Sequence, residues 1–243
     1  MTSRETTGFL PRQAGAAWRR GIGDWAWLLG LGAVQWPWLL KSLHGGLPED
    51  KARLLRRLDL PADALPNLGS WKADTGLLDL LVDEVEALRP AQVVEFGAGA
   101  STLVLAAALA RTGGTLLSFD QHPEFVDATR DWLLSHGLRA DLRPAPLQPA
   151  PGGWPGLWYA APTLPERIDL LVIDGPPWTI HPLTRGAAAT LFSRIAPGGA
   201  VVLDDAARPG ERIVARRWRR EHPEFDWRLH HPGVKGSLVG RRR

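Results

Sequence analysis

The chain has 243 residues, enough to bury an α/β core, and its 44% hydrophobic and 23% charged residues are ordinary for a globular protein. It has no cysteine, which excludes disulfides, thiolate metal sites and cysteine nucleophiles. The net charge of +3 is too small for a dedicated nucleic-acid binder, so no nucleic-acid partner is expected. We interpret the arginine-rich stretches 216–220 and 241–243 as a solvated helix face and a terminal tail.

The first part of the chain is irregular and then becomes rich in tryptophan. Met1–Gly23 shows little periodicity and is predicted to be a flexible lead-in, whereas Asp24–Leu40 is apolar but too short to span a membrane. This tryptophan-rich segment is typical of a helix packed on the catalytic domain or on a second subunit of a homodimer. The alternative is an interfacial helix in peripheral contact with a membrane. Nothing indicates secretion, so we expect a cytoplasmic protein whose tryptophan-rich segment lies away from the chemistry.

Two helices precede the regular part of the chain. Leu47–Leu60 and Gly76–Leu88 each place leucines on one helical stripe, and Pro90 ends the second helix. We therefore expect an N-terminal extension over residues 1–70 and a catalytic domain over residues 71–243.

From Gln92 onward, short β-branched or leucine-rich runs alternate with helical patterns. Strands are predicted at Val93–Phe96, Thr115–Phe119, Ala140–Arg143, Ile168–Ile173 and Ala200–Leu203, followed by an antiparallel pair at Asp226–His230 and Gly236–Gly240 with a turn at Pro232 and Gly233. Strands that alternate with helices form parallel units. The fold class is therefore α/β, with a doubly wound, mostly parallel seven-stranded sheet and a C-terminal antiparallel hairpin. Pro144–Pro165 is expected to be an irregular loop that covers a site.

A glycine-rich turn runs from Glu95 to Thr102, between the first strand and the next helix. Gly97 and Gly99 permit positive φ and a close approach of a ligand to the backbone, although a tight structural turn would also explain them. Thr102 stands where a dinucleotide-binding motif carries its third glycine. The Glu95 carboxylate would repel a pyrophosphate but would tolerate a cationic sulfonium ligand.

Acidic side chains follow the other parallel strands. Asp120 ends the second strand, at the spacing of an acid that accepts both ribose hydroxyls. Asp174 ends the next strongly apolar strand, and Asp204 and Asp205 end the one after it. Ligands bind outside the carboxyl ends of the strands in open α/β sheets, so these acids are expected to converge on one crevice.

With these motifs the chain resembles the class I S-adenosylmethionine-dependent methyltransferases, which have a Rossmann-like fold. The resemblance covers residues 71–239 and rests first on EFGAGAST at Glu95–Thr102. It continues through FDQHPEF at 119–125, APL at 145–147, WY at 158–159, IDGPP at 173–177 and GGAVVLDDAAR at 198–208. It implies S-adenosylmethionine as cofactor and methyl transfer to a small-molecule acceptor, with an oxygen nucleophile expected.

The resemblance also implies cofactor-binding roles. Those roles map onto Glu95, Gly97, Gly99, Ser101 and Asp120, and Thr102 and His122 are added here because they adjoin these positions. Residues 143–147 depart from the acidic adenine contact of many members, so that contact is left open. An NAD(P)-dependent oxidoreductase and a noncatalytic membrane-associated protein that retains the fold are the alternative functions.

Catalytic candidates are the remaining strand-end groups. Asp174, Asp205 or His181 would act as a general base, while a helix-start role for His181 and a capping or loop-holding role for the acids remain open. A cluster of carboxylate oxygens also suits Mg²⁺, so Asp174, Asp204 and Asp205 are candidate metal ligands.

Overall fold

The computed structural model describes residues 21–70, 72–230 and 235–243. Nearly all of the expected lead-in Met1–Gly23 lies outside these residues, and so does the expected turn at Pro232 and Gly233.

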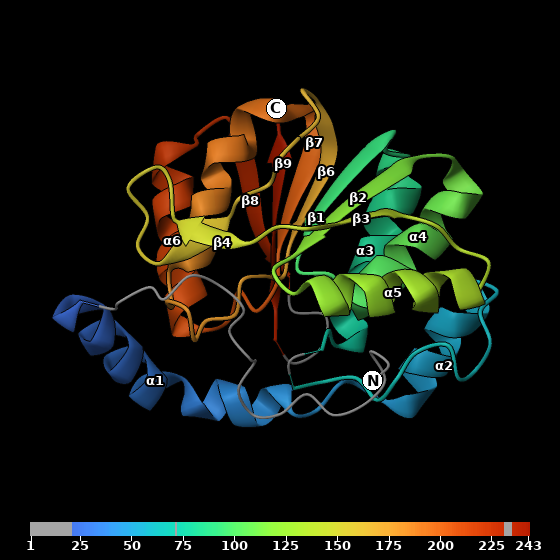
Figure 1. Ribbon diagram of the computed structural model, residues 1–243, viewed down its shortest axis with the longest axis horizontal. Coiled ribbons are helices and arrows are strands. Elements are labelled where there is room, and N and C mark those ends of the chain that lie inside the picture. The colour runs from blue at the N-terminus through green and yellow to red at the C-terminus, as the bar shows by residue number, and fades with distance from the viewer. Residues whose placement is uncertain (1–20, 71, 231–234) are drawn as a thin grey trace.

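One seven-stranded sheet forms the centre of this described part of the chain (Figure 1). Its strand order is β3-β2-β1-β6-β7-β9-β8, in which the first five strands are parallel and the last two antiparallel. The strands are β1 (Gln92–Phe96), β2 (Thr115–Asp120), β3 (Asp141–Pro144), β6 (Ile168–Ile173), β7 (Ile195–Leu203), β8 (Phe225–His230) and β9 (Ser237–Arg242). The expected fold class is confirmed, with β1 directly beside β6. The strand order reverses between β1 and β6, and such a switch point is where ligands bind in open α/β sheets.

Helices cover both faces of the sheet (Figure 1). They are α3 (Thr75–Leu88), α4 (Ala100–Thr112) and α5 (Pro123–Ser135) on one face, and the 3₁₀ helix η1 (Thr184–Arg194) and α6 (Pro209–Glu221) on the other. Alternate side chains of a strand point to opposite faces, so Val93 joins the core under α3 and α4 while Val94 joins the core under η1. Burial on both faces explains the continuous apolar strands of the sequence.

A small hairpin interrupts the segment 144–165 that we expected to be irregular. β4 (Leu147–Pro149) and β5 (Leu157–Tyr159) pair antiparallel as a separate sheet. Strands of three residues are too short for periodicity to reveal them. The hairpin buries Trp158 and Tyr159 against Phe96 of β1, with ring centroids 5.0 and 5.2 Å from the Phe96 ring.

The N-terminal elements are α1 (Ile22–Ser42) and α2 (Pro48–Arg57). Leu54 and Leu55 of α2 share the core of α3 and α4, so this core crosses the boundary expected at residue 70. That boundary therefore stays a prediction. No helix in the described residues has the length and hydropathy of a membrane span.

The tryptophan-rich segment forms most of α1. It lies across the edge of the sheet toward which the parallel strands run (Figure 1) and touches the loop after β6, where Trp178 lies against Gly32. The Ser70 backbone N–H donates to the Ser42 carbonyl at 2.6 Å, which fixes its C-terminal end. The inner face of this helix meets the carboxyl edge of the sheet, and the expectation that the tryptophan-rich segment is peripheral to the chemistry stays a prediction.

Candidate active site

The glycine turn of the sequence connects β1 to α4. Gly97 has φ +100°, and a Cβ there would lie 2.7 Å from the backbone nitrogen of Gly175. Position 97 therefore requires glycine because the loop after β6 packs against it. A Cβ at Gly99 would meet no atom within 4 Å, which leaves open space at the start of α4. Of the two glycines, Gly99 is the one beside space that a ligand could occupy.

Glu95 is fully buried behind this turn. Its Oε2 accepts hydrogen bonds of 2.6 Å from the hydroxyls of Thr102 and Ser118, and the Thr102 hydroxyl accepts from the Gly99 N–H at 2.8 Å. Burial raises the pKa of Glu95 to about 7, although hydrogen bonds from Ser101, Ser118 and Thr102 oppose the shift. Its Oε1 is buried without a partner among the described residues. One oxygen thus holds the turn, while the other is buried and unpaired.

Asp120 ends β2 and is almost fully buried. One of its oxygens accepts the backbone N–H of His122 at 2.9 Å. Burial raises the pKa of this carboxyl to about 7, and the nearby Glu95 adds to the increase. A cationic or hydroxyl-rich ligand would stabilise the ionised form of both acids, because it would supply the charge or hydrogen bonds that water cannot.

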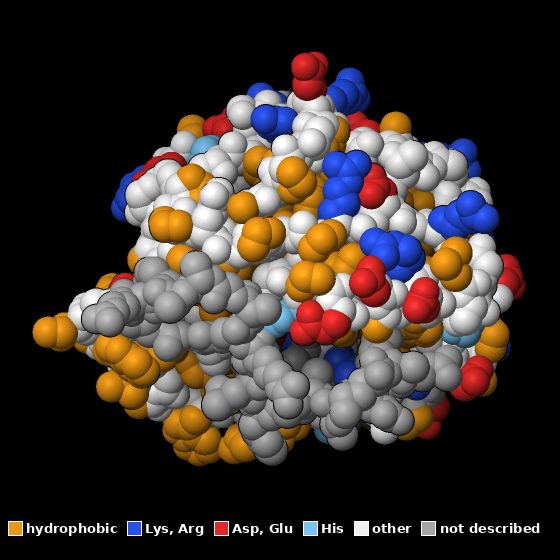
Figure 2. Space-filling view, viewed as in Figure 1, with side chains coloured by type: hydrophobic (Ala, Val, Ile, Leu, Met, Phe, Trp, Pro, Cys, Tyr) orange, Lys and Arg blue, Asp and Glu red, His pale blue; other side chains and the backbone are white. Residues whose placement is uncertain are grey.

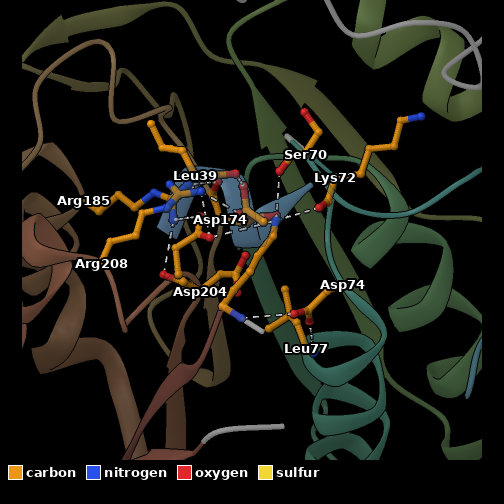
Figure 3. Close-up of polar contacts among 12 residues, drawn as sticks. Leu39, Ser70, Lys72, Asp74, Leu77, Asp174, Arg185, Asp204 and Arg208 are labelled. Atoms are coloured by element: carbon orange, nitrogen blue, oxygen red, sulfur yellow. Dashed lines mark hydrogen bonds and ion pairs between the residues drawn. The ribbon is translucent and has the colours of Figure 1, made fainter. Parts of the chain in front are cut away.

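The remaining acids form one cluster at the ends of β6 and β7 (Figure 3). Asp174, Asp204 and Asp205 each present an oxygen within 4.8 Å of the other two. Burial raises the pKa of Asp174, opposed by the Arg185 guanidinium, and raises the pKa of Asp204 well above its ordinary value. The pKa of Asp205 is lowered, because the opposing charges of Arg208, Lys235 and Arg185 outweigh its burial.

Buried cations complete this cluster, and the sequence reasoning missed them. Arg208 lies 2.9 Å and Arg185 3.3 Å from Asp205, while the Lys235 ammonium is 3.9 Å away. Arg185 also donates to the carbonyl oxygens of Asp174 at 2.5 Å and Pro176 at 3.1 Å. Arg208 is three residues from Asp205, but Arg185 and Lys235 lie about 20 and 30 residues from it in sequence, so no local pattern could have revealed those two.

The two histidines selected from the sequence lie outside the cluster of Asp174, Asp204 and Asp205. His122 is the residue before α5, beside Asp120, and burial lowers its pKa. His181 is buried and does not belong to the acid cluster of the described residues. Its Nδ1 accepts the Leu183 N–H at 3.1 Å, and its Nε2 lies 3.9 Å from Asp24 of α1. These contacts attach α1 to the loop after β6.

Two further side chains have buried polar groups. The Tyr159 hydroxyl lies against Gly175, where an added Cβ would collide with it. Gln35 of α1 is fully buried, and neither of its amide atoms has a hydrogen-bond partner among the described residues. An isolated glutamine in an apolar segment gave no sequence signal of a site. A cavity of about 790 Å³ lies apart from these groups and is lined by residues of α1, α2 and α3 and of their connecting loops.

The fold and the sequence can be compared with known proteins. A family described as "Methyltransferase domain" matches residues 94–206. The sequence matches no curated protein. Among solved structures, the S-adenosylhomocysteine-bound (SAH-bound) methyltransferase PaMTH1 of Podospora anserina aligns with a TM-score of 0.54 at 14% identity, over 95% of this chain and 100% of its own.

Two other structures are similar to the same extent. The O-methyltransferase of Bacillus cereus in complex with SAH has a TM-score of 0.53 at 15% identity, covering 87% of this chain and 97% of that one. Cofactor-bound Rv0187 from MTB has a TM-score of 0.51 at 21% identity, covering 85% of this chain and 95% of that one. At these identities the likeness shows the fold alone.

The sheet order and the glycine turn define an α/β fold of the doubly wound type. Residues 94–206, which include this turn and the acid cluster, match a methyltransferase domain, in agreement with the S-adenosylmethionine-dependent methyltransferase expected from the sequence. The nicotinamide oxidoreductase alternative has no support in these findings.

Proposed function

We propose that the protein transfers a methyl group to an oxygen of a small-molecule acceptor. The observation that carries the proposal is the pair of carboxyl groups at the strand ends beside the switch point, the partly exposed Asp174 and the buried Asp204. An acceptor hydroxyl must lose a proton, and a carboxyl group with a raised pKa is a suitable base near neutral pH. The similar O-methyltransferase of Bacillus cereus supports the same acceptor atom.

The cofactor site in this proposal is the turn after β1 together with the end of β2. Bound S-adenosylmethionine supplies an electrophilic methyl group on a sulfonium. Asp120 would accept the two ribose hydroxyls, and Glu95 would offer its unpaired Oε1 to the positively charged end of the ligand. The open space at Gly99 fits a ligand that approaches the backbone closely. His122, Ser101 and Thr102 would hold these groups in place.

Asp174 is the acid that we assign as base. Its side chain is 15% exposed, whereas that of Asp205 is 4% exposed and is engaged by three cations. The acceptor oxygen would bond to the methyl carbon as the carbon–sulfur bond breaks, and its proton would pass to Asp174. Asp205 would then hold the cations, and His181 would position α1.

The acid cluster is a poor fit for Mg²⁺. Asp205 is a poor ligand for a divalent cation because it is already neutralised by Arg208, Arg185 and Lys235. The positive charge of Lys235 also acts on Asp174 and Asp204 and reduces the excess negative charge that favours metal binding. We therefore route no step through a metal.

Activity measurements test both parts of the proposal. We expect the purified enzyme to transfer the label from S-adenosylmethionine to an oxygen of an acceptor in a panel of small phenols and alcohols. The Asp174→Asn variant should have a kcat lower by about 100-fold or more and an unchanged affinity for SAH. Exhaustive chelation should leave the wild-type rate unchanged. Asp127→Asn, at a side chain that is 71% exposed, is the control. Full activity of Asp174→Asn would remove this acid from the chemistry, and a rate restored only by Mg²⁺ after chelation would make the cluster a metal site.

A further inference from the structure

The polarity of α1 is inverted relative to a helix that covers a soluble domain. Its polar side chains Gln35 and Ser42 are 0% and 5% exposed, and Asp24 faces the buried His181. Leu31 packs against the core, but many of the helix's large apolar side chains lie on the outside: Ile22 is 91%, Leu29 66%, and Trp36 and Leu40 each 57% exposed. A helix on an aqueous surface normally shows the opposite arrangement, with apolar residues inward and polar residues outward.

This outer face of α1 is continuous along the helix. Figure 2 shows hydrophobic side chains gathered at the lower left, over the position that α1 occupies in Figure 1. The further members are Trp25, Trp27, Val34 and Leu43, each about half exposed. Of the large apolar side chains that are exposed in the described residues, only Leu47, Leu134 and Leu229 lie outside this helix and its C-cap. Exposed apolar side chains concentrated in this way mark a binding surface for a protein or a membrane.

We propose that this outer face of α1 binds an anionic lipid surface. Tryptophan is enriched where a protein meets the headgroups of a bilayer, and the outer face contains Trp25 and Trp36. The twenty residues that precede α1 carry four arginines, Arg4, Arg12, Arg19 and Arg20, against a single acid, Glu5. Basic residues beside an apolar helix are attracted to anionic lipids.

The shape of the surface favours a lipid over a second copy of the chain. The exposed side chains form a strip one helix wide and, at 1.5 Å per residue, roughly 30 Å long. A stable dimer buries about 800 Å² per partner over twenty or more residues on each side, which needs a broader surface. Because α1 lies across the carboxyl edge of the sheet, lipid binding would bring the acid cluster close to the bilayer. The proposal does not depend on which atom accepts the methyl group.

Vesicle binding tests the proposal on the full chain. Sedimentation with phosphatidylcholine vesicles that contain about one third phosphatidylserine should recover the protein at least about tenfold better than phosphatidylcholine alone, and added salt should reduce this binding. The triple variant Leu29→Ser, Trp36→Ser and Leu40→Ser should lose about tenfold in vesicle affinity and keep its SAH affinity. The matched control is Leu134→Ser with Leu229→Ser, which removes exposed apolar side chains elsewhere and should bind vesicles like the wild type.

Light scattering after size-exclusion chromatography distinguishes lipid binding from dimer formation through this face. A wild-type dimer that the triple variant converts to a monomer, with no binding to anionic vesicles, would make this face an interface between two copies and overturn the proposal. Equal binding of wild type and triple variant to anionic vesicles would also overturn it. A single Trp36→Ser variant with retained SAH affinity gives the same comparison if the triple variant does not fold.

Discussion

At the residue scale, the acids of the site were predictable and the cations around them were not. Asp120 and Asp174 could be found because each follows an apolar strand, and the carboxyl ends of parallel strands share one edge. Arg185 and Lys235 reach the same edge from η1 and from the hairpin of β8 and β9. Their contacts depend on how distant segments pack, which short-range patterns do not encode. The same reason explains why His181, at the right place in the sequence, contacts α1 instead of the acids.

The ionisation of Asp120 should control cofactor affinity. Because its pKa is about 7, Asp120 is mostly protonated below neutral pH. It must then lose this proton before it can accept two ribose hydroxyls as a carboxylate. SAH affinity measured by calorimetry is therefore expected to fall as the pH is lowered from about 8 to about 6. Below the pKa the loss should approach tenfold per pH unit. Asp120→Asn should weaken binding by roughly tenfold or more at the higher pH and should reduce this pH dependence.

The residual pH dependence of Asp120→Asn is attributed to Glu95, whose pKa is also about 7. Asp127→Asn on the exposed side of α5 is the control and should leave both affinity and its pH dependence unchanged. Parallel affinity curves for wild type and Asp120→Asn across this pH range would assign the titration to another group.

At the element scale, long periodic segments were predicted correctly and short or context-dependent ones were not. The five parallel strands and α3 follow from runs of apolar residues that their own sequence defines. The hairpin of β4 and β5 has strands of three residues, and η1 is a 3₁₀ helix that begins after His181 where we considered a helix start. The position of α1 depends on tertiary contacts that no local pattern specifies.

The link between η1 and the sheet can be tested through Arg185. This guanidinium donates to carbonyl oxygens at the ends of β6 and β7 and pairs with Asp205, all in buried surroundings. Arg185→Met should lower the free energy of unfolding by about 3 to 5 kcal/mol, because it leaves buried carboxylate charge uncompensated. Urea denaturation measures this change.

Arg194→Met is the matched control on the same helix. Arg194 donates only to the carbonyls of Leu164 and Pro165 in partly buried surroundings, so its loss should cost about 1 kcal/mol. Equal destabilisation by the two variants would mean that Arg185 contributes no more than an ordinary pair of hydrogen bonds.

At the scale of the whole molecule, the sequence predicted the sheet and its closing hairpin but not how charge is distributed inside. Buried carboxyl groups gather at one edge of the sheet, and the cations that balance part of them come from segments that are distant in sequence. The apolar core could be predicted from patterns of single residues, whereas this charged interior depends on the complete fold. The domain boundary near residue 70 stays a prediction for the same reason, since α2 and α3 share one core.

The buried acids should make the stability of the ligand-free protein fall as pH rises. Glu95, Asp120 and Glu211 each have a pKa of about 7, with burial as the largest cause, against ordinary values near 4 in the unfolded chain. The folded state therefore binds more protons than the unfolded state between about pH 4.5 and pH 7. By linkage, the free energy of unfolding decreases across this window by up to about 1.4 kcal/mol per pH unit for each group. The lowered pKa of His122 acts in the opposite direction, but it is one group against three.

Urea unfolding at about pH 5.5 and pH 7.5 measures this effect, and the midpoint is expected to be lower at the higher pH. Glu211→Gln removes one of the three groups outside the proposed cofactor site, so it should flatten the pH dependence without changing SAH affinity. Saturating SAH should flatten it further, because the ligand favours the ionised forms of Glu95 and Asp120 and so lowers their pKa in the complex. A midpoint that rises with pH in the ligand-free protein would mean that these carboxyl groups are ionised throughout, with cations compensating their burial as they do at Asp205.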